Sequence, residues 1–276
     1  LHEAGIPAYV FPEAAARALA AMCRQREWLE RPPDESPPLA VDRAKASEIL
    51  GRARAERRAK LSELEALALL DAYGIATAAA ELATTADEAT AAAERAGFPV
   101  AMKIVSPDIT HKTDVGGVRL GLATPDEVRA AFTRMMDDVC SRSPGARVDG
   151  VIVQRMIRGG RETIAGVTRD RLFGPLVMFG LGGILVEALR DVVFRLAPLG
   201  TRDAQEMVTG IRGAAILKGL RGEPPADHDA LVDAVRRVAQ LAVDFPEIEE
   251  MDVNPLLAFE RGAIAIDARF RVAVER

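Results

Sequence analysis

Short apolar segments that alternate with helical segments from Thr77 to the end of the chain constrain the fold more than any other feature. The segment ATAAAELA precedes a helical stretch at residues 86–96, and FPVAMKIV and VRLGLA lie between it and a second helix at residues 125–140. Further apolar runs (DGVIVQRMI, RETIAGVTRD, GPLVMFGLGG and DVVFRLAPL) precede a long helix at residues 227–244. Strands and helices that alternate in this way indicate a mixed α/β fold.

Two local signals place element ends within this pattern. Ser62 is suited to cap a helix whose Leu64, Leu67 and Leu70 face inward, and Gly74 is suited to end it. Near the end of the chain, two apolar runs flank the turn ERG in IEEMDVNPLLAFERGAIAIDARF. This arrangement predicts an antiparallel pair of strands.

A proline-rich stretch gives the clearest domain boundary. Residues 30–40, ERPPDESPPLA, contain four prolines together with acidic residues, which is typical of an extended, solvated linker. An alanine-rich helix with Pro12 in its first turn is predicted before it, at residues 12–29. Because the chain opens on Leu1 and GIPAYVFPEAAARALAAM reads as a strand already entering a helix, we expect a fragment of a longer polypeptide.

Charge and cysteine content argue against several classes of protein. Thirty-six basic and 41 acidic residues give a net charge of −5, which disfavours binding to nucleic acid or to an acidic membrane surface. Cys23 and Cys140 are far apart and lack CxxC spacing, so we expect no disulfide and no zinc site, two buried thiols and a reducing compartment. No apolar run reaches the length of a membrane span, and the expected location is the cytoplasm.

The stretch KIVSPDITHKTDVGGV, residues 103–118, holds the most unusual chemistry. Lys103 lies in an apolar strand, and a buried ammonium group is costly unless it meets an anion such as a phosphate. Alternatively, its side chain extends to solvent at the end of the strand.

The loop after this strand offers a phosphate cradle and a nucleophile. Gly116 and Gly117 allow backbone N–H groups to approach phosphate oxygens, although hairpin turns use the same pair. A neutral His111 beside a bound triphosphate can attack the γ-phosphoryl group, with Asp114 orienting the ring. The simpler alternative is a solvated loop histidine.

The same stretch resembles a known family. GFPVAMKIVSPDITHKTDVGGVRLGL is similar to the nucleotide-binding signature of NDP-forming acyl-CoA synthetases, ATP-grasp enzymes related to succinyl-CoA synthetase. The similarity continues over VQRMIRGGRETIAGVTRDRLFGPLVMFGLGGILVEALRDVVFRLAPL and EEMDVNPLLAF. It implies an ATP-grasp domain of two subdomains at residues 43–276. Residues 1–30 resemble the C-terminal end of a flavodoxin-like CoA-ligase domain, which leaves residues 31–42 as the linker.

The resemblance implies roles for individual residues. Lys103 holds the α- and β-phosphates, and His111 relays the phosphoryl group with Lys112 and Asp114 as electrostatic neighbours. Arg155 departs from the acidic residue that relatives often carry there, which puts nucleotide preference in doubt. The implied nucleotide-binding residues are Gly116 and Gly117 in the loop, Gln154, Arg155, Met156 and Ile157 at the adenine hinge, Glu162 at the ribose, and Gly180, Gly182, Gly183 and Glu187 in the glycine-rich turn.

A Mg²⁺ site is implied on two paired strands near the C-terminus. By resemblance the ligands are Asn254 and Asp267, an amide and a carboxylate of the kind Mg²⁺ accepts. Asp252 alternates with Asn254 on the same strand face, and it either joins the site or supports it. The simpler alternative is a pair of polar turn residues.

The implied activity is an ADP-forming acyl-CoA synthetase, which converts ATP, a carboxylate and CoA to acyl-CoA, ADP and phosphate through acyl phosphate and phosphohistidine intermediates. This chain is expected to perform only part of the cycle, because CoA binds through the upstream CoA-ligase domain. Association into a homo-oligomer is left open. The main alternative is a regulatory ligase-like domain of a protein lysine acetyltransferase.

Overall fold

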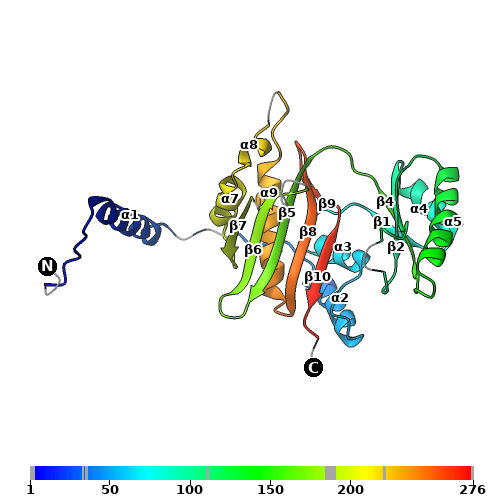
Figure 1. Ribbon diagram of the computed structural model, residues 1–276, viewed down its shortest axis with the longest axis horizontal. Helices are drawn as coiled ribbons and strands as arrows, with labels where there is room; N and C mark the ends of the chain where they lie inside the picture. Colours follow the sequence, from blue (N-terminus) through cyan, green and yellow to red (C-terminus); the bar gives the residue numbers. More distant parts are fainter. Residues whose placement is uncertain are drawn as a thin grey trace. The chain divides into compact units, whose positions relative to one another are not determined.

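The computed structural model describes residues 4–32, 34, 37–109, 112–183, 191–219 and 222–274. The chain divides into two compact units, Leu1–Glu35 and Ser36–Arg276. The division falls inside the proline-rich stretch that the sequence marks as a linker (Figure 1). The attribution of the first unit to a CoA-ligase domain stays a prediction.

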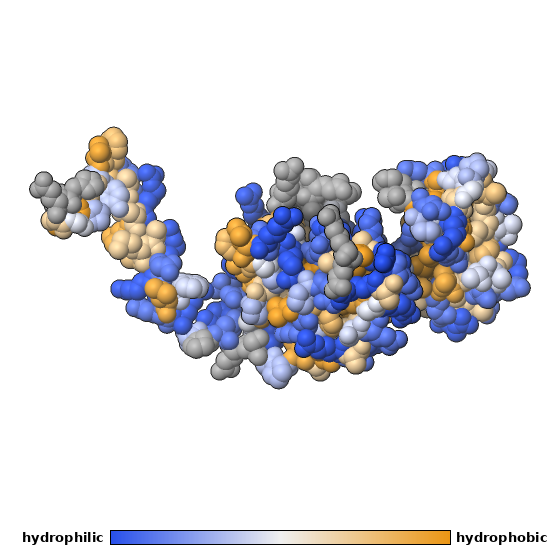
Figure 2. All heavy atoms as spheres, turned by 90° about the horizontal axis from the view of Figure 1, so that it is seen from below, coloured by the Kyte–Doolittle hydropathy of each residue, from blue (hydrophilic) through white to orange (hydrophobic). Residues whose placement is uncertain are grey.

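The first unit contains helix α1 (Pro12–Leu29), which buries none of its side chains. Pro12 occupies the first turn as the sequence predicts, where a missing N–H leaves no hydrogen bond unmade. Figure 2 shows apolar residues on the surface of this helix, and Leu19, Met22 and Trp28 are all more than half exposed. Among the described residues of this unit, nothing therefore covers the apolar side chains of α1.

The second unit contains a small antiparallel sheet with two helices on one face (Figure 1). Its strands pair in the order β1-β4-β2-β3. Met102 and Ile104 point toward the helices, where they pack with Ala93 and Met135 in a separate hydrophobic core. Because side chains alternate along a strand, Lys103 lies on the opposite face. The elements are β1 (Ala80–Ala83), α4 (Ala86–Ala96), β2 (Val100–Val105), β3 (Val118–Leu122), α5 (Pro125–Arg142) and β4 (Gly150–Arg155).

A larger sheet and its helices make up the rest of the second unit. The strands are β5 (Arg161–Asp170), β6 (Gly174–Leu181), β7 (Val192–Leu196), β8 (Ile248–Ala258), β9 (Ala263–Ala265) and β10 (Ala268–Val272), in the order β10-β8-β5-β6-β7 with β9 beside β8. The helices are α2 (Arg43–Ala55), α3 (Glu63–Ala72), α7 (Thr201–Gly210), α8 (Ala214–Leu217) and α9 (His228–Asp244). Helix α9 lies behind β5 and β6 (Figure 1) and packs into a second core. The two sheets confirm the mixed α/β fold of two subdomains.

Side-chain caps fix the helix ends. Ser62 and Glu65 form a capping box at α3, in which the Ser62 Oγ accepts from the Glu65 N–H at 3.3 Å and Glu65 Oε2 accepts from the Ser62 N–H at 2.9 Å. Gly74 follows α3 with φ of +75°, so its predicted role as a stop is confirmed. Helix α9 begins at His228, one residue after its cap Asp227. No helix in the described ranges is long and apolar enough to cross a membrane.

Both cysteines are exposed, so the expectation of buried thiols is wrong. Cys23 lies on α1, which has no core to enter. Cys140 lies on the face of α5 opposite Met135 and Val139, which are buried. The apolar character of a thiol alone does not reveal which face of a helix it occupies.

One face of the larger sheet is left open beside the small sheet. Asp252 of β8 pairs in register with Arg269 of β10 and with Gly166 of β5, so these residues lie on one face. Their neighbours Met251 and Val253 point into the core on the other face. The open face therefore carries the polar residues of the sheet.

The two sheets meet through a short polar connection. Gln154 at the end of β4 is buried, and its side-chain amide donates to the Ile266 carbonyl at 3.0 Å. Thr77 forms an isolated bridge with Ala265 nearby. Residue 266 directly precedes Asp267, so this connection holds the small sheet beside the start of β10.

Candidate functional site

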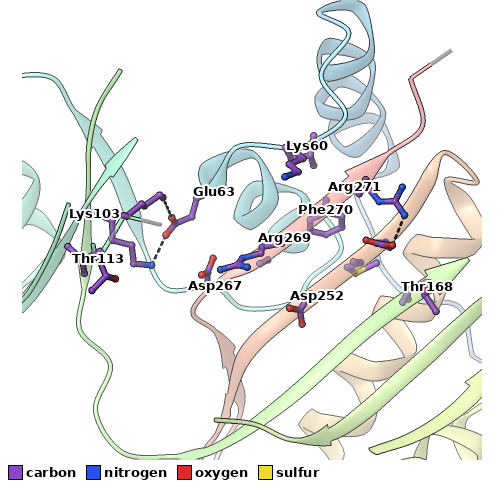
Figure 3. A pocket seen from close by; sticks show the side chains of 17 residues that line it. Lys60, Glu63, Lys103, Thr113, Thr168, Asp252, Asp267, Arg269, Phe270 and Arg271 are labelled. Atoms are coloured by element: carbon purple, nitrogen blue, oxygen red, sulfur yellow. Dashed lines mark hydrogen bonds and ion pairs between the residues drawn. The ribbon is translucent and has the colours of Figure 1, made fainter. Parts of the chain in front are cut away.

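A cavity of about 940 Å³ opens between the small sheet and the open face of the larger one. Lys103 and Lys112 line it from the small sheet and the following loop, and Asp252 and Asp267 line it from β8 and the start of β10. Figure 3 shows Lys103 on one side of the space, Asp267 and Asp252 on the other, and Glu63 beside Lys103. Three of the residues that the sequence assigns to phosphate or metal binding thus share one cavity.

Glu63 supplies the anion that the position of Lys103 demands. The Lys103 Nζ lies 2.7 Å from Glu63 Oε1, and the two side chains are 18% and 10% exposed. The partner in the structure is therefore a carboxylate of this chain, at the first residue of α3. Sequence reasoning missed Glu63, because its position in the first turn of a helix is already explained by the helix dipole.

Glu63 also pairs with a second lysine. The Lys112 Nζ lies 3.2 Å from Glu63 Oε2, and the Lys112 side chain is 28% exposed. Burial by itself would raise the pKa of Glu63, but the charges and hydrogen bonds of Lys103 and Lys112 outweigh it and hold that pKa below the ordinary value of 4.5. Glu63 is thus a carboxylate that two ammonium groups keep charged.

Two carboxyl groups on the opposite wall show the reverse behaviour. Burial raises the pKa of Asp267, and the negative charge of Glu63 adds to this, while Lys103 and Arg269 oppose it. Burial also raises the pKa of Asp252, against the charge of Arg269 and with that of Asp267. Negative charge on these two carboxyl groups is therefore unfavourable in the folded protein.

The same wall fits a divalent cation. Among the described residues, the buried Asp252 Oδ1 has no hydrogen-bond partner, which is unfavourable unless a cation or other donor meets it. Asn254 is exposed two residues further along β8, and its backbone N–H donates to the Asp267 carbonyl at 3.1 Å. Among the described residues no three His, Cys, Asp or Glu side chains form a metal cage. A few oxygen ligands suit Mg²⁺, which keeps several of its waters.

The loop between β2 and β3 is described in part. His111 and Thr110 lie outside the described residues, and Asp114 is exposed. The N–H groups of Gly117 and Gly116 donate within the loop, to the carbonyls of Lys112 at 2.7 Å and of Thr113 at 3.1 Å. A Cβ on Gly117 would lie 2.5 Å from Ile104 Cδ1, so the structure needs this glycine for close packing. Phosphate binding by the two glycines stays a prediction.

The predicted adenine hinge does not line the cavity. Gln154 is tied to the Ile266 carbonyl, and the Met156 N–H donates to the Pro99 carbonyl at 2.9 Å. Arg155 is exposed and Ile157 is half-buried. Gln154 and Arg155 end β4, and Met156 and Ile157 follow it, next to the connection between the sheets. Their role in adenine binding stays a prediction.

Glu162 and the glycine-rich turn are brought together, away from the cavity lining. The Gly182 N–H donates to the Glu162 carbonyl at 2.7 Å, and a Cβ on Gly183 would lie 2.0 Å from Glu162 Oε2. A Cβ on Gly180 would lie 2.5 Å from the Asp191 carbonyl oxygen. Close backbone approach thus accounts for these glycines, and Glu187 lies outside the described residues.

The cavity is also lined by basic residues that the sequence reasoning did not select. Lys60 and Arg269 are exposed there, and Arg271 pairs with Glu249 at 2.6 Å and with Glu250. The alternation of β10 was the available signal, because Asp267, Arg269 and Arg271 recur at every second position. The cavity therefore has cations on both sides of its carboxylates.

Comparisons with known proteins agree with this geometry. Residues 52–272 match the family described as the ATP-grasp domain. The β subunit of ADP-forming acetate–CoA ligase I from Pyrococcus furiosus is 48% identical over 226 residues, which cover 82% of this chain and 97% of that subunit. ADP-forming acetate–CoA ligase I from Archaeoglobus fulgidus is 43% identical over 276 residues, the whole of this chain but 40% of that protein.

Solved structures of a related enzyme also match this chain. Dinucleotide-forming acetyl-coenzyme A synthetase 1 of Ca. Korarchaeum cryptofilum, in complex with coenzyme A and Ca-AMPCP, has a TM-score of 0.79 and 41% identity, covering 83% of this chain and 100% of the matched chain. Another structure of that enzyme holds Mg-AMPPCP, with a phosphohistidine segment pointing towards the nucleotide binding site. The chain belongs to the ATP-grasp domain family, among the β subunits and corresponding domains of ADP-forming acetate–CoA ligases.

Proposed function

We propose that this chain is the nucleotide-binding portion of an ADP-forming acyl-CoA synthetase, which converts ATP, a carboxylate and CoA to acyl-CoA, ADP and phosphate. The observation that carries the proposal is the meeting of Lys103 and Lys112 with Asp267 and Asp252 around one cavity. Phosphoryl transfer depends on positioning the reacting groups and on stabilising the charge of the phosphates. A cavity with cations on one wall and oxygen ligands on the other meets that need.

The phosphates of ATP bind at the end of the cavity that contains the two lysines. Lys103 is held by β2 and therefore provides a fixed ammonium group, while Lys112 extends from the loop. Charge-assisted hydrogen bonds from ammonium groups to phosphate oxygens are stronger than neutral ones. The two lysines thereby hold the polyphosphate facing the β10 wall.

Asp267 and Asn254 hold Mg²⁺, and Asp252 supports them from the same strand as Asn254. The orphan Oδ1 of Asp252 and the burial of both carboxyl groups support this assignment, because a cation offsets exactly the charge that burial penalises. Held by these residues, Mg²⁺ would supply positive charge that neutralises negative charge developing on the phosphates during transfer. The positive charge of Lys103 also acts on Asp267 and opposes the rise in the pKa of that carboxyl group.

Adenosine binds toward the connection between the sheets. Main-chain groups of Met156 and Ile157 contact adenine, with Gln154 and Arg155 beside them. The hydrogen bond from Gln154 to the Ile266 carbonyl supports this orientation, because it places the hinge next to the residue that precedes Asp267. The ribose is assigned to Glu162, with Gly182 and Gly183 packed against it.

His111 relays the phosphoryl group, as its sequence resemblance implies, with Lys112 and Asp114 as neighbours and Gly116 and Gly117 in the same loop. An imidazole nitrogen forms a bond to the γ-phosphorus, the bond to the bridging oxygen breaks, and ADP leaves. The phosphoryl group then passes to a partner domain or subunit that binds CoA. The β-subunit relatives and the phosphohistidine segment of the Korarchaeum enzyme support such a partner.

Calorimetry with the full chain tests the nucleotide site. Wild-type protein is expected to bind Mg-AMPPCP, and Lys103→Ala is expected to bind it at least about tenfold more weakly through loss of one charge-assisted contact. Lys45→Ala is the matched control, since Lys45 pairs with Asp71 in a part of the surface outside the cavity lining. Wild-type protein that fails to bind Mg-AMPPCP would overturn the proposal.

A further inference from the structure

Glu63 places a negative charge inside a site that is proposed to bind anions. Its carboxylate lines the same cavity as Lys103 and Lys112 and engages both of their ammonium groups. Any phosphate that approaches these lysines meets ammonium groups that already donate to Glu63. Glu63 and the phosphates of a nucleotide therefore compete for the same two groups.

The two contacts of Glu63 are unequal. The contact with Lys103 spans 2.7 Å and joins side chains that are 18% and 10% exposed. The contact with Lys112 spans 3.2 Å, and the Lys112 side chain is 28% exposed. Lys103 comes from the middle of β2, where both neighbouring strands pair with it, whereas Lys112 comes from a loop. Lys112 is thus the partner that is more easily withdrawn.

We propose that Glu63 is a resident counter-ion of the cleft, which pairs with both lysines when no nucleotide is bound and yields Lys112 to the incoming phosphates while it keeps Lys103. This inference rests on the proposed function, because it takes the cavity to be the nucleotide site. The charged groups that line the same cavity from other described elements include Asp267, Arg269, Asp252 and Lys60.

The arrangement has a functional consequence for the reaction cycle. Because Glu63 stays beside Lys103, its charge repels the phosphates of every bound nucleotide and weakens the retention of both ATP and ADP. Binding that is equally strong for the substrate and the transition state does not raise kcat, and a site that holds ADP too firmly delays turnover. Glu63 thus keeps the lysines charged and in place in the empty cleft and moderates their hold on the nucleotide.

A purely structural role makes a different prediction. The first turn of α3 is already stabilised by the capping box of Ser62 and Glu65, which makes no contact with the two lysines. A second acidic residue in that turn would serve the helix dipole without reaching across to another sheet. Loss of a structural residue lowers stability but does not distinguish ligands by their phosphates.

Calorimetry on the full chain separates the two roles. Glu63→Gln is expected to bind Mg-AMPPCP about tenfold more tightly than wild type, because a charge that repels the phosphates is gone, and to bind adenosine unchanged. Glu65→Gln is the matched control on the same helix, and it is expected to bind both ligands as wild type does. Unchanged or weaker binding of Mg-AMPPCP by Glu63→Gln would refute the counter-ion.

A double-mutant cycle tests the exchange at Lys112. If phosphates displace Glu63 from Lys112, Glu63→Gln improves binding less in a Lys112→Met background than in wild type. Equal gains in the two backgrounds would exclude displacement at Lys112. Should Glu63→Gln fail to fold, Glu63→Asp keeps the charge but withdraws it by one methylene, and tighter binding supports the exchange whereas unchanged binding contradicts it.

The outcomes also separate this inference from the proposed function. Wild-type protein that does not bind Mg-AMPPCP contradicts the nucleotide site itself. Wild-type protein that binds Mg-AMPPCP, together with a Glu63→Gln variant that binds no more tightly, contradicts only the counter-ion.

Discussion

The Lys103 Nζ lies 2.7 Å from Glu63 Oε1, and this ion pair joins β2 of the small sheet to the first turn of α3. The remainder of α3 packs in the core of the larger subdomain through Ala66, Leu69 and Leu70. The pair therefore spans the cleft between two subdomains with separate cores. Its partners are 40 residues apart in the sequence.

Lys103→Met is expected to lower the free energy of unfolding by about 1.5–3 kcal/mol, the range for a hydrogen bond to a charged group. The methionine keeps the aliphatic stem but leaves Glu63 with Lys112 as its remaining lysine partner. Urea denaturation measures the loss. Lys45→Met is the control, since its exposed pair with Asp71 should contribute less than about 1 kcal/mol. An equal loss of unfolding free energy in the two variants would show that the cleft pair stabilises the fold no more than an exposed pair does.

Mg²⁺ is expected to raise the melting temperature of the wild type, because a ligand that binds only the folded state stabilises it by about 2.7 kcal/mol at 100 times its Kd. Asp267→Asn should lose most of this gain. In Mg²⁺-free buffer the same variant should be as stable as the wild type or slightly more stable, because its buried carboxylate is unfavourable. Asp229→Asn, at a side chain that is 97% exposed, is the control. Retention of the full Mg²⁺ response by Asp267→Asn would remove that residue from the metal site.

The capping box of α3 should make stability depend on pH in the acid range. Although burial opposes it, hydrogen bonds from Arg58 and Ser62 lower the pKa of Glu65 from 4.5 to about 2. A carboxyl group with a lowered folded-state pKa stabilises the fold above its unfolded pKa, and this contribution disappears as the pH falls from about 4.5 toward 2. Glu65→Gln should lower the free energy of unfolding at pH 7 by about 1–2 kcal/mol and flatten the decline between pH 4.5 and 2. Urea denaturation at several pH values measures this dependence. If the free energy of unfolding falls as steeply in Glu65→Gln as in the wild type, the capping box does not cause the decline.

Gly117→Ala is expected to destabilise the protein by about 1–3 kcal/mol, as overpacking does in a core. The new Cβ would lie 2.5 Å from Ile104 Cδ1 and 2.9 Å from the Lys112 carbonyl oxygen. Gly51→Ala provides the opposite case within helix α2, since its Cβ meets nothing within 4 Å and should stabilise the helix by about 0.5–1 kcal/mol. Thermal unfolding measures both variants. A melting temperature that is higher for Gly117→Ala than for Gly51→Ala would contradict the close packing at Gly117.

His111 should carry an acid-labile phosphate after incubation with Mg-ATP and the CoA-binding partner, because an N-phosphoryl bond hydrolyses in acid. His111→Ala should abolish this label, whereas His2→Ala should retain it. Autoradiography of labelled protein before and after acid treatment provides the measurement. A label of undiminished strength in His111→Ala would move the relay to another residue.

The fold could be read from the sequence because its signals are local. The alternation of apolar runs and helical segments predicted the mixed α/β fold, and the resemblance to ATP-grasp enzymes implied its two subdomains. The cap at Ser62 and the stop at Gly74 fixed the ends of α3. Expected helix ends differed from the observed ones by one or two residues, since the last turn of α5 continues from Cys140 to Arg142. The burial of the cysteines could not be read, because it depends on which face meets a core.

The site could be predicted only in part, because most of its contacts join distant segments. The argument that Lys103 needs an anion was sound, but its partner in the structure is Glu63, and no sequence pattern links a strand residue to a helix start 40 residues away. Asp267 was implied by the family resemblance, and Asp252 could be found because it alternates with Asn254 on one strand face. The hinge at Met156 lies beside the cavity lining, and its role stays a prediction.

The division of the second unit into two hydrophobic cores has a mechanical consequence. Because Met102 and Ile104 belong to one core and Leu69 and Leu70 to the other, the small sheet can swing as a rigid lobe without exposing either interior. The energetic barrier to such a swing lies in polar contacts such as those of Glu63 and Gln154. Such a swing would widen the cavity between the two lobes through a hinge movement that leaves all secondary structure intact.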